Sequence, residues 1–154
     1  MPQDGEKAPD FELPTEDGKA LKLAKLKGKP VVLYFYPKDD TSGCTREAQD
    51  FTALAAEFEK AGTWVLGVSK DEPAKHRKFI DKYDLKVALA SDADGTACET
   101  FGTWVEKRLY GRNYMGIERA TFLIDRDGRI DRIWRKVKVA GHAAAVLEAA
   151  KELA

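Results

Sequence analysis

The sequence predicts an α/β domain built on a mixed β-sheet that is covered on both faces, and three observations support this fold class. The run Val31–Tyr36 contains only apolar and aromatic residues, which is typical of a central strand buried on both faces. Strand-like runs alternate along the chain with segments of helical periodicity. The chain then finishes with a hairpin and a helix, an order that indicates an α/β sandwich with a mixed sheet.

Each element follows from its local pattern. Two short strands, 11–13 and 20–23, flank a turn and predict an N-terminal β-hairpin. After the central strand, four apolar residues at helical spacing predict a helix from about Thr45 to Lys60. The same two patterns predict the remaining elements in order: a strand at 63–69, a helix through 76–83, a strand at 87–90, a helix near 96–101, strands at 120–125 and 129–134 joined by an Asp-Gly turn, and a last helix through 146–153.

Composition narrows the class of protein. A chain of 154 residues, 44% of them apolar and without linker or repeat, is expected to form one domain over 1–154. Equal numbers of basic and acidic residues, 26 of each, argue against nucleic acid or an anionic membrane as partner. The longest apolar run is six residues, and the N-terminus has no signal-peptide pattern, so we expect a cytoplasmic protein.

No metal or cofactor is expected from the sequence. Two cysteines and two histidines cannot supply a four-ligand zinc site without carboxylates, and neither common nucleotide-binding glycine motif is present.

Cys44 is the strongest candidate for a reactive residue. It follows the predicted central strand and the loop Pro37–Gly43, and it precedes a predicted helix. At the first turn of a helix, free N–H groups and the helix dipole favour a thiolate. Gly43 allows a small ligand to approach the backbone, the Thr41 hydroxyl can turn toward the sulfur or its target, and Pro37 fixes the loop and shields the pocket. The alternative is a structural, half-buried cysteine at a helix start.

The string Pro37-x-x-x-Thr41-x-x-Cys44 resembles the active-site signature of peroxiredoxins, and the longer string Phe35–Glu47 resembles their PrxQ branch, also called bacterioferritin comigratory protein. The likeness continues through segments at 8–11, 67–71, 91–95, 101–104 and 114–125. It implies a thioredoxin-like fold and a thiol peroxidase that reduces hydrogen peroxide and organic hydroperoxides to water and alcohols.

Carried over residue by residue, the resemblance makes Cys44 the peroxidatic cysteine and Thr41 and Pro37 the motif residues around it. Arg119, ahead of the strand 120–125, resembles the arginine that lies against the thiolate, and Glu47 resembles an acidic residue that steadies it. A guanidinium there would hold the thiolate and bind the peroxide. The Thr41 hydroxyl and the Cys44 backbone N–H would complete a polar site for two adjacent oxygens. Without the family resemblance, the favoured interpretation of Arg119 is a member of an ordinary surface ion pair.

The sequence departs from the family at the resolving cysteine. The two usual positions hold Gln49 and Ile80, and the family's proline before Gly-Cys is Ser42. Cys98, the only other cysteine, reads as core packing; an atypical resolving role would need the two Cα atoms within about 7 Å. We therefore expect a one-cysteine mechanism in which an external thiol (thioredoxin, glutaredoxin or a small thiol) reduces the sulfenic acid.

Other hypotheses stay open at this stage. A disulfide reductase of the same fold would need a Cys-x-x-Cys, and Thr41 stands where its first cysteine would be. A redox-inactive binding or chaperone module is the alternative from another class. A Cys–His pair is a further option, although His76, among Lys75, Arg77 and Lys78, reads as the edge of a helix and His142 as the start of the last helix. No large exposed apolar strip stands out, and the family branch that the sequence resembles is often monomeric, so we expect a monomer.

Overall fold

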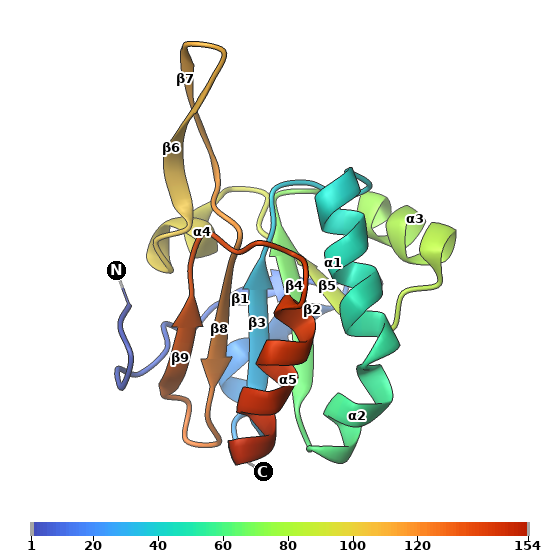
Figure 1. Cartoon of the computed structure of the whole chain (residues 1–154), viewed down its shortest axis with the longest axis vertical. Helices are drawn as coiled ribbons and strands as arrows, with labels where there is room; N and C mark the ends of the chain where they lie inside the picture. The colour runs from blue at the N-terminus through green and yellow to red at the C-terminus, as the bar shows by residue number, and fades with distance from the viewer. Residues whose placement is uncertain (1, 154) are drawn as a thin grey trace.

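The computed structural model describes residues 2–153, and its centre is a five-stranded sheet (Figure 1). The strand order is β5-β4-β3-β8-β9. The strands are β3 Val31–Phe35, β4 Trp64–Ser69, β5 Ala88–Ser91, β8 Ala120–Ile124 and β9 Ile130–Trp134. β3, β4 and β5 run parallel, whereas β8 is antiparallel to both of its neighbours. The predicted mixed sheet, with the apolar run from Val31 at its centre, is confirmed.

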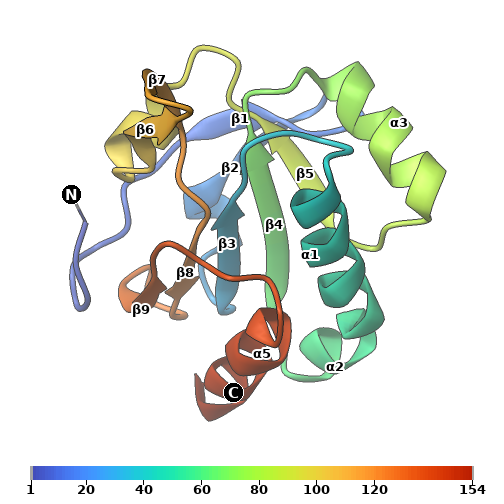
Figure 2. The same cartoon turned by 45° about the horizontal axis from the view of Figure 1, so that its top comes forward.

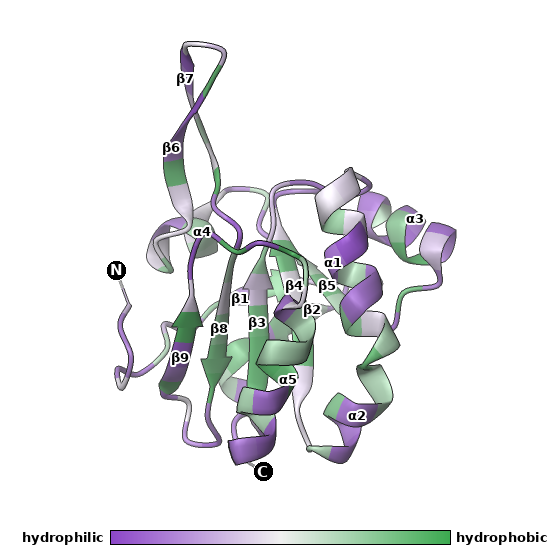
Figure 3. Ribbon diagram, viewed as in Figure 1, coloured by the Kyte–Doolittle hydropathy of each residue, from purple (hydrophilic) through white to green (hydrophobic). Residues whose placement is uncertain are grey.

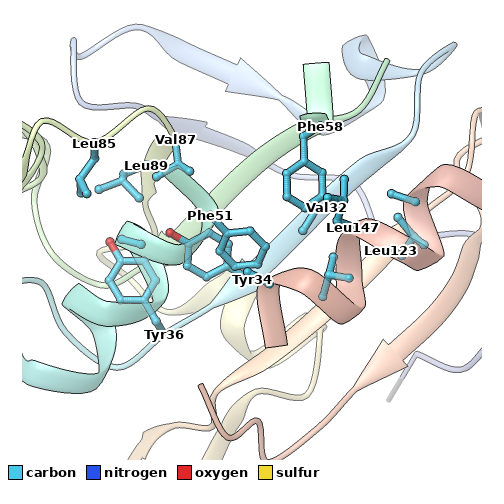
Figure 4. Packing of buried hydrophobic residues seen from close by; sticks show 14 of the residues in the cluster. Val32, Tyr34, Tyr36, Phe51, Phe58, Leu85, Val87, Leu89, Leu123 and Leu147 are labelled. Atoms are coloured by element: carbon cyan, nitrogen blue, oxygen red, sulfur yellow. The ribbon is translucent and has the colours of Figure 1, made fainter. Parts of the chain in front are cut away.

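Helices cover one face of this sheet, which we call the α1 face. They are α1 Ser42–Ala53, α2 Ala55–Lys60, α3 Pro73–Tyr83 and α5 His142–Leu153 (Figure 2). Phe51 of α1 stacks on Tyr34 of β3 with ring centroids 4.8 Å apart, and Figure 4 shows the two rings side by side. Gly67 is the residue of β4 that pairs with Tyr34. It must be a glycine, because a Cβ at this position would lie 2.7 Å from the Tyr34 ring.

The opposite face, which we call the α4 face, is covered by shorter elements. These are α4 Thr96–Thr100, the 3-10 helix η1 Leu23–Leu26 and the N-terminal hairpin of β1 Glu12–Pro14 and β2 Ala20–Lys22. Phe35 and Phe122 of the sheet pack here against Phe101, which directly follows α4. The central strand β3 is buried at every position, so its side chains pack on both faces of the sheet. It is largely green in the hydropathy colouring of Figure 3.

The structure adds a two-stranded arm that the sequence patterns do not predict. β6 Trp104–Leu109 and β7 Arg112–Ile117 pair antiparallel and project from the end of the molecule where α1 begins (Figure 1). The two-residue turn Tyr110-Gly111 has positive φ at both positions, which suits a tight hairpin. Four of the five exposed large apolar side chains among residues 2–153 lie on this arm: Leu109, Tyr110, Tyr114 and Met115. The sequence patterns do not predict these exposed side chains.

The helix predicted from about Thr45 to Lys60 begins earlier and is interrupted. α1 begins at Ser42, and Leu54 lies between α1 and α2 with φ −102° and ψ 7°, which ends the first helix. Earlier initiation places Cys44 inside the first helical turn. The other predicted elements, including the N-terminal hairpin, are present, and their ends differ from the predicted ones by at most four residues. None of the helices described for residues 2–153 has the length and apolar character needed to cross a bilayer.

Candidate active site

Cys44 is the third residue of α1, at the end of the sheet where the parallel strand β3 terminates. The Thr45 N–H donates to the Thr41 carbonyl at 2.8 Å, which starts the helix before the cysteine is reached. The first four N–H groups of a helix have no partner within it, so the Cys44 backbone lies at the positive end of the helix dipole. The side chain is 2% exposed. Cys44 is therefore a buried thiol in an environment suited to negative charge.

Arg119 joins Cys44 to Glu47. Its Nη2 donates to Cys44 Sγ at 3.3 Å, and its Nη1 donates to Glu47 Oε1 at 2.6 Å. Arg119 follows β7 and precedes β8, 75 residues from the cysteine in sequence. The Arg119 side chain is 16% exposed, so the reading as an ordinary surface ion pair is wrong. A Cβ added at Gly43 would lie 3.1 Å from Arg119 Nη2, so the glycine lets the guanidinium approach the loop.

Glu47 supplies the other end of this contact. It lies on α1 one turn beyond Cys44 and is 1% exposed, and its second oxygen, Oε2, is buried without a hydrogen-bond partner. Burial raises the pKa of Glu47 to about 7, although the attraction of Arg119 acts in the opposite direction. Glu47 thus holds the guanidinium through Nη1 while Nη2 contacts the sulfur.

The raised pKa of Glu47 makes stability depend on pH. Its stabilising contribution is fully present below the unfolded value near 4.5 and is lost as the pH rises through about 7. Relative to Glu47→Gln, we expect the free energy of unfolding of the wild type to fall by about 3 kcal/mol between pH 4.5 and pH 8, the equivalent of that pKa change. Urea unfolding of both proteins across this range measures the difference. If the unfolding free energies of the wild type and Glu47→Gln changed with pH in parallel, the raised pKa of Glu47 would be contradicted.

Thr41 and Pro37 occupy the loop between β3 and α1. Pro37 is partly buried, and Thr41 is exposed at the N-cap position of α1. The Thr41 hydroxyl donates to the Lys38 carbonyl at 2.9 Å. A hydroxyl has one hydrogen and two lone pairs, so toward a bound molecule Thr41 can only accept. Neither residue contacts the sulfur through a hydrogen bond, but the loop holds both within seven residues of Cys44.

Cys98 lies on the other side of the sheet. Cys44 belongs to the cluster on the α1 face, and Cys98 to the cluster on the α4 face. Cys98 is fully buried, and its backbone N–H donates to Asp92 Oδ2 at 2.8 Å. Burial, with the Asp92 carboxylate nearby, raises the pKa of the Cys98 thiol far above its usual range. Both cysteines are free thiols.

The two histidines are more buried than their sequence context indicates. His142 does begin α5, as expected, and its Nε2 lies 2.8 Å from Thr121 Oγ1; burial lowers its pKa to about 4. His76, which reads from its charged neighbours as the edge of a helix, is fully buried, and its Nδ1 lies 2.6 Å from Asp39 Oδ2 in the loop before Cys44. The charged neighbours of His76 in sequence concealed this contact. Neither histidine is hydrogen-bonded to Cys44.

One group of side chains has the composition of a metal site. Asp39, Asp71 and His76 place one ligand atom each within 4.8 Å of one another. The two carboxylates and the imidazole of this group are already engaged in hydrogen bonds. We assign no metal to them.

Comparison with known proteins decides between the hypotheses. The profile of the AhpC/TSA family matches residues 5–133. The "Putative peroxiredoxin bcp" of Coxiella burnetii is 54% identical over 93% of this chain and 95% of its own length. This chain belongs to the AhpC/TSA family, among the Bcp (PrxQ) peroxiredoxins.

The solved structures agree with this membership. The bacterioferritin comigratory protein of Xanthomonas campestris superposes with a TM-score of 0.88 at 46% identity, covering 92% of this peroxiredoxin and 90% of that chain. A cysteine-to-serine mutant of Xylella fastidiosa PrxQ gives a TM-score of 0.94 at 36% identity, covering 99% and 97%. This peroxiredoxin is therefore a thioredoxin-fold thiol peroxidase, and the redox-inactive binding module is not supported.

Proposed function

We propose that Cys44 is the peroxidatic cysteine of this peroxiredoxin and that it works by a one-cysteine mechanism. The observation that carries the proposal is the Arg119 Nη2 contact on Cys44 Sγ at 3.3 Å. The Cys44 thiolate attacks one oxygen of a hydroperoxide, the S–O bond forms as the O–O bond breaks, and the departing alkoxide or hydroxide takes a proton to leave as alcohol or water. Cys44 is left as a sulfenic acid.

The neighbouring groups have separate roles in this step. Arg119 stabilises the thiolate and donates to the peroxide oxygens as negative charge moves onto the leaving oxygen. Thr41 accepts the hydrogen of the hydroperoxide, since its own hydrogen is donated to the Lys38 carbonyl. The N–H of Cys44, beside Gly43, donates to the peroxide. Pro37 shields the pocket, and Glu47 holds the guanidinium in place.

Reduction of the sulfenic acid needs a thiol from outside the chain. One thiol condenses with Cys44 sulfenic acid, releasing water and forming a mixed disulfide, and a second thiol releases Cys44 as the external disulfide forms. The usual resolving positions hold Gln49 and Ile80. Cys98 is buried on the opposite face of the sheet with a raised thiol pKa, so it is neither accessible nor nucleophilic in this fold. An atypical resolving role for Cys98 would require both α1, which carries Cys44, and α4, which carries Cys98, to rearrange.

Cys98→Ser should therefore retain most of the turnover with dithiothreitol. After one equivalent of peroxide, we expect the intact mass of the wild type to correspond to a lone sulfenic acid, trapped by dimedone, with Cys98 still available to a thiol label after unfolding. Cys98→Ala is the matched variant that tests packing rather than chemistry. A Cys44–Cys98 disulfide formed within one turnover, with recycling lost in both variants, would establish the two-cysteine mechanism instead.

The remaining expectations concern the setting of the enzyme. We propose thioredoxin, glutaredoxin or a small thiol as reductant, hydrogen peroxide and organic hydroperoxides as substrates, and no cofactor. The Xanthomonas campestris relative is described as having alkyl peroxide reduction activity, which supports the organic substrates. Two free cysteines support a reducing, cytoplasmic setting. We also propose a monomer that acts as one domain over 1–154; sedimentation tests the monomer, because the β6–β7 arm exposes apolar side chains that a second copy could cover.

A further inference from the structure

The catalytic loop is tied to α3 by a buried network that the reaction itself does not use. Asp39, in the loop between β3 and α1, is 2% exposed, which is unusual for an aspartate. His76 Nδ1 lies 2.6 Å from Asp39 Oδ2, and the Tyr36 hydroxyl donates to Oδ1 at 2.5 Å. The other nitrogen of His76, Nε2, lies 3.0 Å from the Ala90 carbonyl oxygen. The imidazole thus bridges the end of strand β5 and the catalytic loop.

The hydrogen-bond partners define how His76 acts. A carbonyl can only accept, so Nε2 carries a hydrogen and donates it to Ala90. A single hydrogen then lies between Nδ1 and the Asp39 carboxylate. Both Asp39 oxygens are therefore occupied, and a fully buried imidazole fixes the side chain of a loop residue 37 positions away in sequence.

The backbone at Asp39 leads directly to Thr41. The Asp39 N–H donates to Asp71 Oδ2 at 2.7 Å, and the Lys38 carbonyl of the same peptide group accepts from the Thr41 hydroxyl at 2.9 Å. Because a peptide group is planar and its N–H and C=O point in opposite directions, holding Asp39 also sets the direction of the Lys38 carbonyl. That carbonyl decides which way the Thr41 lone pairs face.

We propose that His76 is a positioning residue for the peroxidase reaction, acting through Asp39 and the 38–39 peptide on the Thr41 hydroxyl. The proposal rests on the one-cysteine function assigned to Cys44 above. His76 keeps Thr41 as a hydrogen-bond acceptor at the place where a hydroperoxide binds. It does not act on the thiolate, which Arg119 contacts from another element.

Two isosteric replacements separate the two contacts of His76. In His76→Asn the amide nitrogen lies near the place of Nδ1 and can still bond to Asp39; in His76→Gln it lies near the place of Nε2 and can still bond to Ala90. We expect His76→Gln to slow single-turnover oxidation of Cys44 by hydrogen peroxide about tenfold, and His76→Asn to slow it less than threefold. Alkylation of Cys44 by iodoacetamide, which does not use Thr41, should change less than twofold in both.

A double-mutant cycle tests whether the effect passes through Thr41. Thr41→Val removes the acceptor, so adding His76→Gln to it should cause no further loss of the peroxide rate. The control uses the exposed hydrogen bonds between the same loop and α3, in which Lys82 and Tyr83 donate to Asp40. The variant Lys82→Gln/Tyr83→Phe should oxidise within twofold of wild type.

The outcomes are distinct. Equal losses in His76→Gln and His76→Asn that follow their melting temperatures, or a His76→Gln loss that persists undiminished in the Thr41→Val background, would overturn the positioning role. If the histidine variants do not fold, Tyr36→Phe removes the hydroxyl that donates to Asp39 Oδ1 and lies 3.4 Å from His76 Nδ1. It should lower the peroxide rate without lowering the alkylation rate, and an unchanged ratio of the two rates would overturn the proposal. Peroxide chemistry away from Cys44 would instead contradict the proposed function and would appear already in Cys44→Ser.

Discussion

Cys44→Ser should lose peroxidase activity by at least about a thousandfold, equivalent to about 4 kcal/mol of transition-state stabilisation. Serine keeps the shape of the side chain but does not supply a nucleophilic anion near neutral pH, even beside Arg119 at the start of α1. Peroxide consumption in the presence of dithiothreitol measures the effect. Circular dichroism and the melting temperature should stay close to wild type, because one atom changes at a site that remains hydrogen-bonded.

The control for this variant is the other buried cysteine. Cys98→Ser makes the same chemical change in α4, on the opposite face of the sheet, and should stay active. A Cys44→Ser protein with native circular dichroism that still consumed peroxide at the wild-type rate would move the chemistry to another residue. Loss of activity in both variants would point to a shared disulfide.

The sheet and the position of Cys44 could be predicted because their signals are local. A strand buried on both faces must be apolar throughout, and the strand–loop–helix order around Cys44 follows from adjacent segments. The β6–β7 arm gave no such signal. Most of its residues are exposed on both sides, so neither apolar alternation nor a buried run marks it, and only Tyr110-Gly111 hints at a turn.

The site residues divide in the same way. Pro37, Thr41 and Cys44 lie within eight consecutive residues and could be recognised together. Arg119 was found only through the family resemblance, because 75 residues separate it from the sulfur. The sequence brings His76 into consideration but does not predict its contact with Asp39. Its neighbours Lys75, Arg77 and Lys78 suggest a solvated helix edge. Its helical spacing with Phe79 and Tyr83 places it on the apolar face, but only the fold brings Asp39 to it.

Arg119→Ala should slow the reaction of Cys44 with peroxide by at least tenfold, about 1.4 kcal/mol of transition-state stabilisation. The guanidinium donates to the sulfur and to Glu47 at the same time, and a positive neighbour favours the thiolate. Alkylation of Cys44 by iodoacetamide near neutral pH should slow as well, in contrast to the His76 variants. Stopped-flow oxidation and the alkylation time course together separate loss of thiolate from loss of peroxide binding.

Removing Arg119 also leaves Glu47 buried without its partner, which by itself costs stability. The double variant Arg119→Ala/Glu47→Gln replaces that carboxyl by a neutral amide, so it should regain stability while the peroxide rate stays low. Arg132→Ala, which removes an exposed guanidinium lying over Trp134, is the control for loss of an arginine and should react at the wild-type rate. Recovery of the peroxide rate in the double variant would mean that Arg119 serves only to neutralise Glu47. A rate that stays low after stability returns places its effect on the reacting sulfur and the peroxide.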